Sequence, residues 1–205
     1  MPDPREIRNT RLNNEYIELM RINCSIIQIE PLGNTPYEKY KITFNIRTII
    51  SPEPSYRSKT VCILTIPARY PKAPPEIMAT TTPYPWHINW FTTGRWCIGY
   101  WNIEESLANF IYRCAKTLQF DPEIANPESV ANSSAVPFWE ANKHNCQVIP
   151  SDNQVLPTLD ALTINERERA NPKIIIQSSR VDKPKINIKS SRVDKPKINI
   201  INKSS

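Results

Sequence analysis

Residues 70–97 read YPKAPPEIMATTTPYPWHINWFTTGRWC, and this stretch decides how the rest of the chain is interpreted. It begins with a proline-rich motif and ends with an amide side chain, Asn89, eight residues before a thiol, Cys97. The segment between them shows neither helical nor strand periodicity. A thiol can carry an acyl group as a thioester, and an amide N–H can hydrogen-bond the oxyanion that forms when an amine attacks it. The stretch therefore predicts a cysteine site for acyl transfer.

Cys97 is the cysteine that we expect to react, although a single cysteine is more often a small buried hydrophobic residue. Cys24, Cys62 and Cys114 fit that simpler description because each lies in or beside an apolar segment. Cys146 has no motif around it. Cys97 differs because it closes a segment that already carries the proline-rich motif and two polar residues upstream.

Those two polar residues, Asn89 and His87, each have a structural alternative. An asparagine in a loop most often stabilises a turn, and this role does not exclude hydrogen bonding to an oxyanion. We expect His87 to hold the loop by a hydrogen bond, because a general base would need a partner that the sequence does not identify.

The segments around this stretch predict an α+β fold. Residues 4–23 have the pattern of an amphipathic helix, with apolar positions at Leu12, Tyr16, Leu19 and Met20. Strand character follows in four segments, at residues 25–30, 37–50, 60–66 and 76–80. Short connections between neighbouring strands favour an antiparallel meander, and 60–66 is the most apolar of the four.

Two helices are predicted after the cysteine. Residues 106–118 have an apolar face that predicts a core helix, which Asp121-Pro122 should stop. A further helix is predicted to begin at about Ser129 or Ala135 and to end at Lys143.

His87, Asn89 and Cys97, placed behind the motif Tyr-Pro-x-x-Pro-Pro, resemble the active-site region of ubiquitin-conjugating enzymes. The family pattern is His-Pro-Asn with the acceptor cysteine ten residues after the histidine, and His87 and Cys97 have the same spacing. Ile88 stands where the family has proline. The order of helix, four strands, cysteine segment and helices matches the family's fold, so the resemblance covers roughly residues 5–145.

The resemblance implies a transferase. Ubiquitin or a ubiquitin-like protein, supplied by an adenylating enzyme, would be carried as a thioester on Cys97 and passed to an amine, with a ligase as a further partner. Asn89 would be the oxyanion donor and His87 would support the loop. The family often has an Asp or Ser bordering the site from the loop after the core helix, and aligning Asp121-Pro122 puts Asn126 there. No cofactor, metal ion or membrane is expected.

The replacement of proline by Ile88 leaves the loop without a backbone restraint. Proline would fix its own φ and push His87 into an extended conformation, so packing must hold the loop instead. Four tryptophans crowd this region, and they form either a displaced part of the core or a platform for the tail of the modifier: Trp86, Trp90, Trp96 and Trp101. The departure favours a divergent member of the family, from a bacterium or a virus.

Two other functions compete with the transferase. One is an inactive protein of the same fold that binds a modifier or a partner, and the retained Cys97 and Asn89 argue against it. The other is an interaction module of the related RWD type, which has a similar proline motif. Such a module has no reason to keep a histidine, an asparagine and a cysteine in this register.

Composition places the basic charge in the C-terminal part of the chain. The 205 residues carry a net charge of +6, with 3 glycines against 20 prolines. Residues 151–205 contain eleven Lys and Arg against six Asp and Glu, whereas residues 1–150 contain fifteen against fourteen. The predicted folded part is therefore nearly neutral, and nucleic-acid binding is not expected from it.

Residues 178–188 recur identically at 190–200, which gives a repeat of twelve residues. A repeat this short cannot bury a face of its own, so we predict a catalytic domain at 1–147 and a low-complexity basic tail at 148–205. The five cysteines form no CxxC pair, and no run of about 20 apolar residues occurs. These features favour a soluble cytoplasmic protein with reduced thiols.

Overall fold

The computed structural model describes residues 3–150 and Leu156. The predicted tail, with its repeats, lies outside the described residues except for 148–150 and Leu156.

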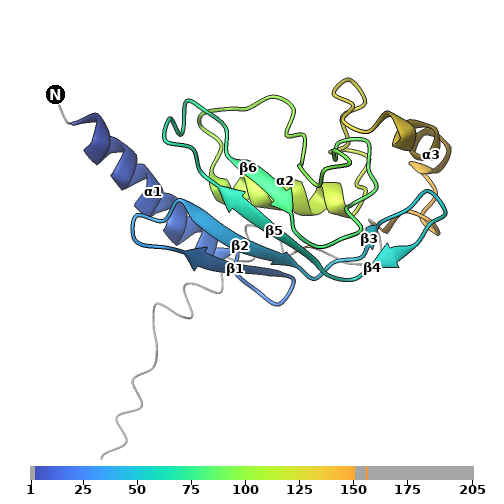
Figure 1. The fold of residues 1–205 in the computed structure, drawn as a ribbon, viewed down its shortest axis with the longest axis horizontal. Helices are drawn as coiled ribbons and strands as arrows, with labels where there is room; N and C mark the ends of the chain where they lie inside the picture. The colour runs from blue at the N-terminus through green and yellow to red at the C-terminus, as the bar shows by residue number, and fades with distance from the viewer. Residues whose placement is uncertain (1–2, 151–155, 157–205) are drawn as a thin grey trace, which may run out of the picture. The chain divides into compact units, whose positions relative to one another are not determined.

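An antiparallel four-stranded sheet forms the centre of the described chain, as the sequence predicted (Figure 1). Its strands are β1 (Ile27–Leu32), β2 (Lys39–Phe44), β5 (Thr60–Thr65) and β6 (Glu76–Ala79), and their order in the sheet is β1-β2-β5-β6. Each strand pairs with its predecessor in that order, so the sheet is a meander. The excursion between β2 and β5 holds the small hairpin of β3 (Thr48–Ile49) and β4 (Tyr56–Arg57).

Buried side chains alternate along β5 and β6 and meet buried residues of the neighbouring strands, which puts one face of the sheet in the core. The register pairs these buried residues directly: Ile29 with Ile42, Ile42 with Cys62, Tyr40 with Leu64, and Leu64 with Ile77. The confirmed strand 60–65 alternates over its whole length.

Two strands differ from the prediction in their bounds. β1 continues through Pro31, which an edge strand tolerates when that nitrogen points away from its neighbour. The N–H of Ile29, two residues earlier, donates to Asn23 Oδ1 at 3.0 Å, so this side of β1 is the free edge. The predicted strand 37–50 is two strands. The chain stays in register with β1 as far as Asn45, whose N–H donates to the carbonyl of Ile26, and it then leaves the sheet to pair with β4.

The first helix, α1 (Pro4–Arg21), matches the prediction, with Asp3 as its N-cap and Leu12 and Leu19 fully buried. The core helix α2 (Leu107–Leu118) begins after the N-cap Ser106 and packs into the same hydrophobic core as the buried face of the sheet (Figure 1). Within the described residues, no helix combines the length and the apolar character that crossing a membrane would require.

A buried carboxylate connects α1 to the proline-rich motif and to α2. Glu15 is only 3% exposed, and it accepts hydrogen bonds from Arg11 Nε at 2.6 Å, from the Tyr70 hydroxyl at 2.7 Å and from the N–H of Leu107 at 2.6 Å. Burial and the adjacent Glu15 raise the pKa of Tyr70, so its hydroxyl stays protonated and donates. This cluster explains the tyrosine of the motif as a structural residue.

The end of α2 sets the direction of the following loop. The N–H groups of Phe120 and Asp121 donate back to Thr117 and Lys116, the pair of bonds that closes a Schellman motif. Phe120 occupies the left-handed position with φ 64°, where a non-glycine residue costs about 1–2 kcal/mol. Its ring is 1% exposed, so burial offsets that cost and fixes the turn.

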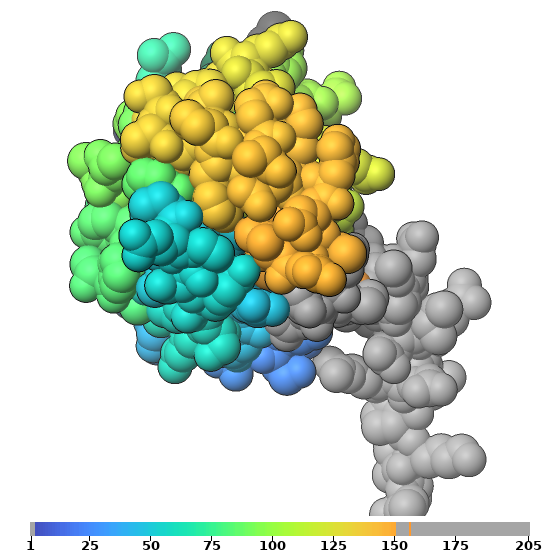
Figure 2. Space-filling model, turned by 90° about the vertical axis from the view of Figure 1, so that its right-hand side faces the viewer, coloured from blue at the N-terminus to red at the C-terminus, as the bar shows by residue number. Residues whose placement is uncertain are grey.

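A second, smaller hydrophobic cluster includes η1 (Ser133–Ala135) and α3 (Val136–Asn142), the predicted late helix in its shorter version. It also includes Ile149, and the Tyr56 hydroxyl donates to the carbonyl of Val148 at 2.8 Å. Figure 2 shows residues of the β3–β4 hairpin beside residues of α3 and 143–150. Leu156 is 6% exposed and belongs to the main core. These contacts extend beyond residue 147, where the sequence placed the end of the domain.

Candidate active site

A tight hairpin brings Asn89 and Cys97 together. The N–H of Cys97 donates to the carbonyl of Asn89 at 2.8 Å, and the N–H of Phe91 donates to Arg95 at 2.8 Å. The chain reverses at residues 91–94, where Gly94 has φ +87°. The eight-residue spacing in the sequence therefore corresponds to two paired backbone segments, an arrangement that the periodicity of the stretch did not reveal.

The cysteine arm of this hairpin lies along the edge of β6. Trp96 donates to the carbonyl of Ile77 at 3.0 Å, and Ala79 donates to the carbonyl of Gly94 at 2.8 Å. A Cβ atom at Gly94 would lie 2.6 Å from the ring of Tyr84, so this position requires glycine. The reactive segment is thus attached to the sheet instead of being a free loop.

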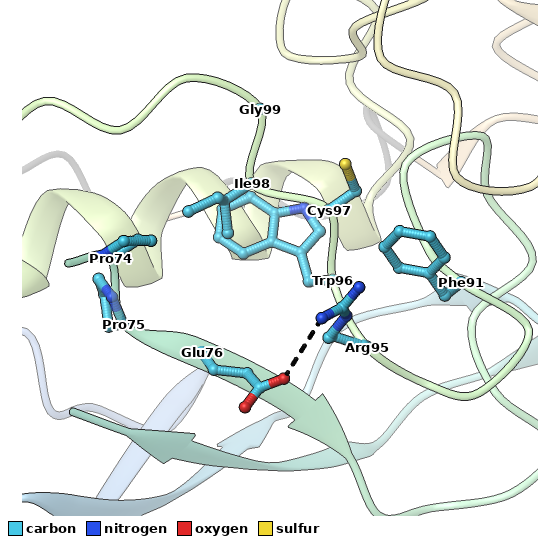
Figure 3. A pocket seen from close by; sticks show the side chains of 9 residues that line it. All are labelled: Pro74, Pro75, Glu76, Phe91, Arg95, Trp96, Cys97, Ile98 and Gly99. Atoms are coloured by element: carbon cyan, nitrogen blue, oxygen red, sulfur yellow. Dashed lines mark ion pairs between the residues drawn. The ribbon is translucent and has the colours of Figure 1, made fainter. Parts of the chain in front are cut away.

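Cys97 is half-buried and lies between two hollows. The larger, of about 420 Å³, is bordered by Pro74, Glu76, Phe91 and Arg95, and in Figure 3 the sulfur of Cys97 points away from Glu76 and Arg95. The smaller, of about 290 Å³, is bordered by Asn89, Gly99, Arg113 and Asn126. Cys97 therefore borders open space on two sides.

The remaining cysteines differ in their access to solvent. Cys62 and Cys114 are fully buried, and burial raises the pKa of both thiols, so they are inert core residues as expected. Cys24 is half-buried. Cys146 is exposed and lies far from the proline-rich motif in the sequence. Cys146 is the cysteine against which the reactivity of Cys97 has to be compared.

The side chain of Asn89 is fully hydrogen-bonded to the loop that follows α2. Its Nδ2 donates to the carbonyl of Asn126 at 2.7 Å and to the carbonyl of Ser129 at 2.9 Å, and its Oδ1 accepts the N–H of Asn126 at 2.8 Å. Because the partners are backbone groups, they fix which end of the amide is oxygen. Asn89 is 3% exposed and attaches residues 126–129 to the hairpin.

Asn126, the predicted bordering residue, lies at the smaller hollow and is exposed. Its Oδ1 accepts the N–H of Glu128 at 2.9 Å, which is an Asx turn. Its Nδ2 donates to none of the residues that the structure describes. Ser129, which the sequence reasoning missed, contacts the thiol directly, with its Oγ 3.3 Å from Cys97 Sγ.

A signal for Ser129 was present in the sequence. The resemblance called for an Asp or Ser in the loop after the core helix, and Ser129 is the only residue of either type between Pro122 and Asn132. Aligning Asp121-Pro122 with the family's Asp-Pro placed Asn126 at the bordering position. That alignment assumed the family's spacing between the Asp-Pro pair and the bordering residue. The structure brings both Asn126 and Ser129 to the site.

His87 is buried and lies under the loop. Its Nδ1 accepts the N–H of Asn89 at 3.0 Å, and its ring meets Phe120 edge-on with centroids 4.4 Å apart. Burial lowers the pKa of His87 to about 3, so the ring is neutral near pH 7. Its geometry is that of a structural residue, with the Nδ1 lone pair occupied and the side chain 1% exposed.

Packing and hydrogen bonds hold the loop at Ile88, where the family has proline. Ile88 is fully buried in the second cluster, and its carbonyl accepts the N–H groups of Ala131 and Asn132 at 2.7 and 3.0 Å. Trp90 and Trp96 belong to the main core, which favours the displaced-core interpretation for these two.

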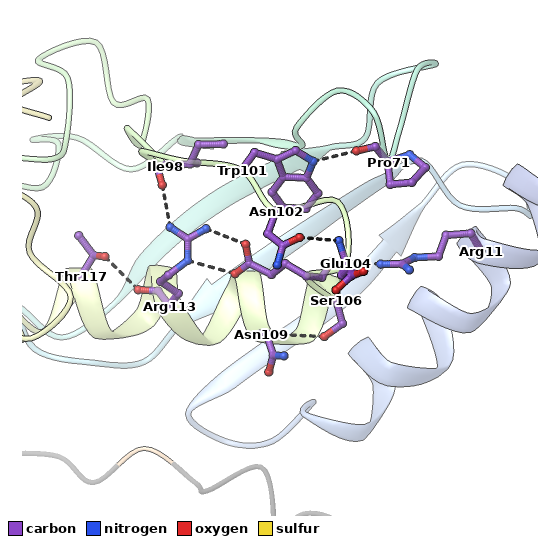
Figure 4. A network of polar contacts seen from close by, with 11 residues as sticks. Arg11, Pro71, Ile98, Trp101, Asn102, Glu104, Ser106, Asn109, Arg113 and Thr117 are labelled. Atoms are coloured by element: carbon purple, nitrogen blue, oxygen red, sulfur yellow. Dashed lines mark hydrogen bonds and ion pairs between the residues drawn. The ribbon is translucent and has the colours of Figure 1, made fainter.

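An arginine on α2 holds the residues that follow Cys97. Arg113 donates to the carbonyl of Ile98 at 2.7 Å and forms two hydrogen bonds with the carboxylate of Glu105, at 3.0 and 2.9 Å (Figure 4). Its guanidinium also lies 5.0 Å from the centroid of the Trp96 ring. The charge of Arg113 is thus paired, and its hydrogen bonds fix the backbone beside the thiol.

The site combines an accessible thiol with amide and hydroxyl groups and lacks a charged base next to the sulfur among the described residues. In the same part of the chain, no three His, Cys, Asp or Glu side chains gather as a metal site would require. In the comparisons with known proteins, no family model matches the chain and no curated protein matches it.

Proposed function

We propose that the protein is a transferase of the ubiquitin-conjugating type, which carries ubiquitin or a ubiquitin-like protein as a thioester on Cys97. The observation that carries the proposal is the setting of this thiol. Cys97 is half-buried on a hairpin attached to the sheet edge, open to two hollows, while Cys62 and Cys114 are inaccessible. A thioester carrier needs one side for the acyl group and another for the incoming nucleophile.

The reaction has two steps. The sulfur of Cys97 attacks the thioester carbonyl of the activated modifier, and the thiol of the activating enzyme leaves with the proton. An amine then attacks the Cys97 thioester, an amide bond forms, the C–S bond breaks, and the proton lost by the nitrogen reaches the leaving sulfur through water. His87 takes no proton in this scheme, because it is buried and its pKa is about 3.

One observation favours the competing proposal of an inactive binding protein. Both hydrogens of the Asn89 amide are used by carbonyls of the 126–129 loop, so this amide is not free to meet an oxyanion. Under that alternative the cluster would hold the fold and Cys97 would not be acylated.

The deciding experiment supplies the protein with ubiquitin or a ubiquitin-like protein, the matching activating enzyme and ATP. We expect an adduct that thiol reductant removes, and Cys97→Ser should give a reductant-resistant oxyester or no adduct. Cys146→Ser is the matched control, because it removes an exposed thiol and should leave the adduct unchanged. Equal charging of Cys97→Ala and wild type would refute the proposal.

A further inference from the structure

We propose that the side-chain amide of Asn126, and not that of Asn89, donates the hydrogen bond to the oxyanion when the Cys97 thioester is attacked. This inference rests on the proposed function. It assigns Asn89 a different task, as the positioning residue that holds Asn126 in place.

Asn89 is excluded as the donor by its own hydrogen bonds. Its carboxamide pairs with the peptide group of Asn126 in both directions, at 2.7 and 2.8 Å, and its second hydrogen goes to Ser129 at 2.9 Å. Releasing one hydrogen would leave a carbonyl without its donor beside a residue that is 3% exposed. The loss of that hydrogen bond opposes the release during the reaction.

Asn126 has the free donor that Asn89 lacks. Its Oδ1 accepts the N–H of Glu128, so the amide nitrogen must face the other way. That nitrogen lies 3.5 Å from the point where a Cβ atom on Gly99 would stand, which puts it beside the backbone two residues after Cys97. Asn126 and Cys97 border the same hollow of about 290 Å³.

Other donors at this hollow are less suitable. The guanidinium of Arg113 is engaged by Glu105 and by the carbonyl of Ile98. Tyr100 is 88% exposed and directed to solvent, and the indole of Trp96 is 4% exposed in the main core. The amide of Asn126 is neutral, oriented by its own turn and open to the hollow, as a preorganised donor should be.

The expected effect is set by exposure. A donor in a water-excluded site contributes about 10²–10³-fold to the rate, and Asn126 is exposed, so we expect a loss of about 10²-fold. The loss should occur in the rate constant for discharge, and the final extent of Cys97 loading, which is an equilibrium between thioesters, should be unaffected by the same change.

The test uses the full chain with Cys146→Ser, loaded on Cys97 by a synthetic peptide thioester ending in glycine and checked by peptide mass spectrometry. Hydroxylamine is the nucleophile, because it is too small to depend on an acceptor-binding surface. Asn126→Ala and the near-isosteric Asn126→Asp should both discharge about 100-fold more slowly, with thermal unfolding close to that of the parent.

Asn102→Ala is the matched control. The Oδ1 of Asn102 accepts the N–H of Glu104 at 3.0 Å, so it makes the same kind of turn without bordering either hollow at Cys97. Its discharge rate should stay within about twofold of the parent, since it removes a turn hydrogen bond and no oxyanion donor.

Discharge of Asn126→Ala at the parent rate would overturn the inference, and slow discharge of Asn89→Ala in that case would identify Asn89 as the donor. Both results leave the proposed function standing. If the loaded parent protein discharges no faster than the same peptide thioester of a small thiol in solution, the proposed function fails and the inference fails with it.

Discussion

Glu15 and Asn89 are both buried polar side chains that connect segments far apart in the sequence, and they do so with different chemistry. Glu15 is charged, and it is matched by a guanidinium, a hydroxyl and a backbone N–H from α1, the proline-rich motif and α2. A buried charge is stable only when it is paired and hydrogen-bonded throughout, so a cluster of this kind has no spare group for a ligand.

Asn89 is neutral, and its cluster is open at one side. Its amide is as fully hydrogen-bonded as the carboxylate of Glu15. Its partners, however, lie at the half-buried thiol: Ser129 contacts Cys97, and Asn126 borders the same hollow. A neutral amide costs less free energy to bury than a charge, so the polar groups near it do not all have to be paired and can remain exposed. The difference between a closed charged cluster and an open neutral one separates residues that hold the fold from residues that can do chemistry.

Glu15→Ala should produce the largest loss of stability. It leaves the Tyr70 hydroxyl and the N–H of Leu107 without an acceptor, and breaking a buried ion pair costs about 3–5 kcal/mol. Urea unfolding measures the change, and Glu18→Ala on the exposed side of the same helix should cost less than about 1 kcal/mol. If the Cys97 thioester discharged more slowly per folded molecule, the Glu15 cluster would not be purely structural, and the contrast with the Asn89 cluster would be wrong.

Asn89→Ala should have the next largest effect, and it should act on stability and discharge together. Three hydrogen bonds to the 126–129 loop are lost, at about 0.5–1.5 kcal/mol each, so we expect a loss of about 2–3 kcal/mol in the free energy of unfolding. Discharge should slow because Asn126 is no longer held. Asn34→Ala, in an exposed turn, is the control and should change neither quantity. An effect on discharge with unchanged stability would argue against a positioning role.

Acidification should destabilise the Asn89 cluster through His87. The unfolded chain protonates this histidine below a pKa of about 6.5, whereas burial holds the folded pKa at about 3. The contribution is therefore fully present above pH 6.5 and decreases by about 1.4 kcal/mol per pH unit as the pH falls toward 3. Between pH 7 and 5, wild type should lose about 2 kcal/mol more than His87→Gln in urea unfolding. Parallel curves would mean that His87 is not the neutral support of the loop.

Removal of Pro172–Ser205 should have the smallest effect. Its two repeats offer a few isoleucines and no aromatic side chain, while ordering a residue costs about 1–2 kcal/mol of backbone entropy. We expect the midpoint of thermal unfolding to shift by no more than a few degrees and Cys97 charging to persist. Truncation after residue 147 is the informative contrast, because it removes Ile149 and Leu156, which are buried. A large effect of the shorter truncation would show that the tail contributes to the domain.

The elements that local pattern controls were predicted from the sequence. α1, the strands at 60–65 and 76–79 and the core helix α2 agree with their periodicity, because each buries one face and repeats its apolar residues at the matching spacing. The predictions were less accurate where the chain leaves the sheet after Asn45 to form a separate hairpin, and where an edge strand tolerates Pro31. Neither case is visible to a local rule.

The sequence by itself determined the α+β fold class, the residues that face the core and the candidate thiol Cys97. Only the tertiary structure decided what the polar residues around that thiol do, because hydrogen-bond saturation depends on partners from distant parts of the chain. It engaged both hydrogens of Asn89, left those of Asn126 open and brought Ser129 to the sulfur. Side-chain type and spacing specify which hydrogen-bonding groups the chain contains. The role of each group depends on whether folding has paired it with another part of the chain.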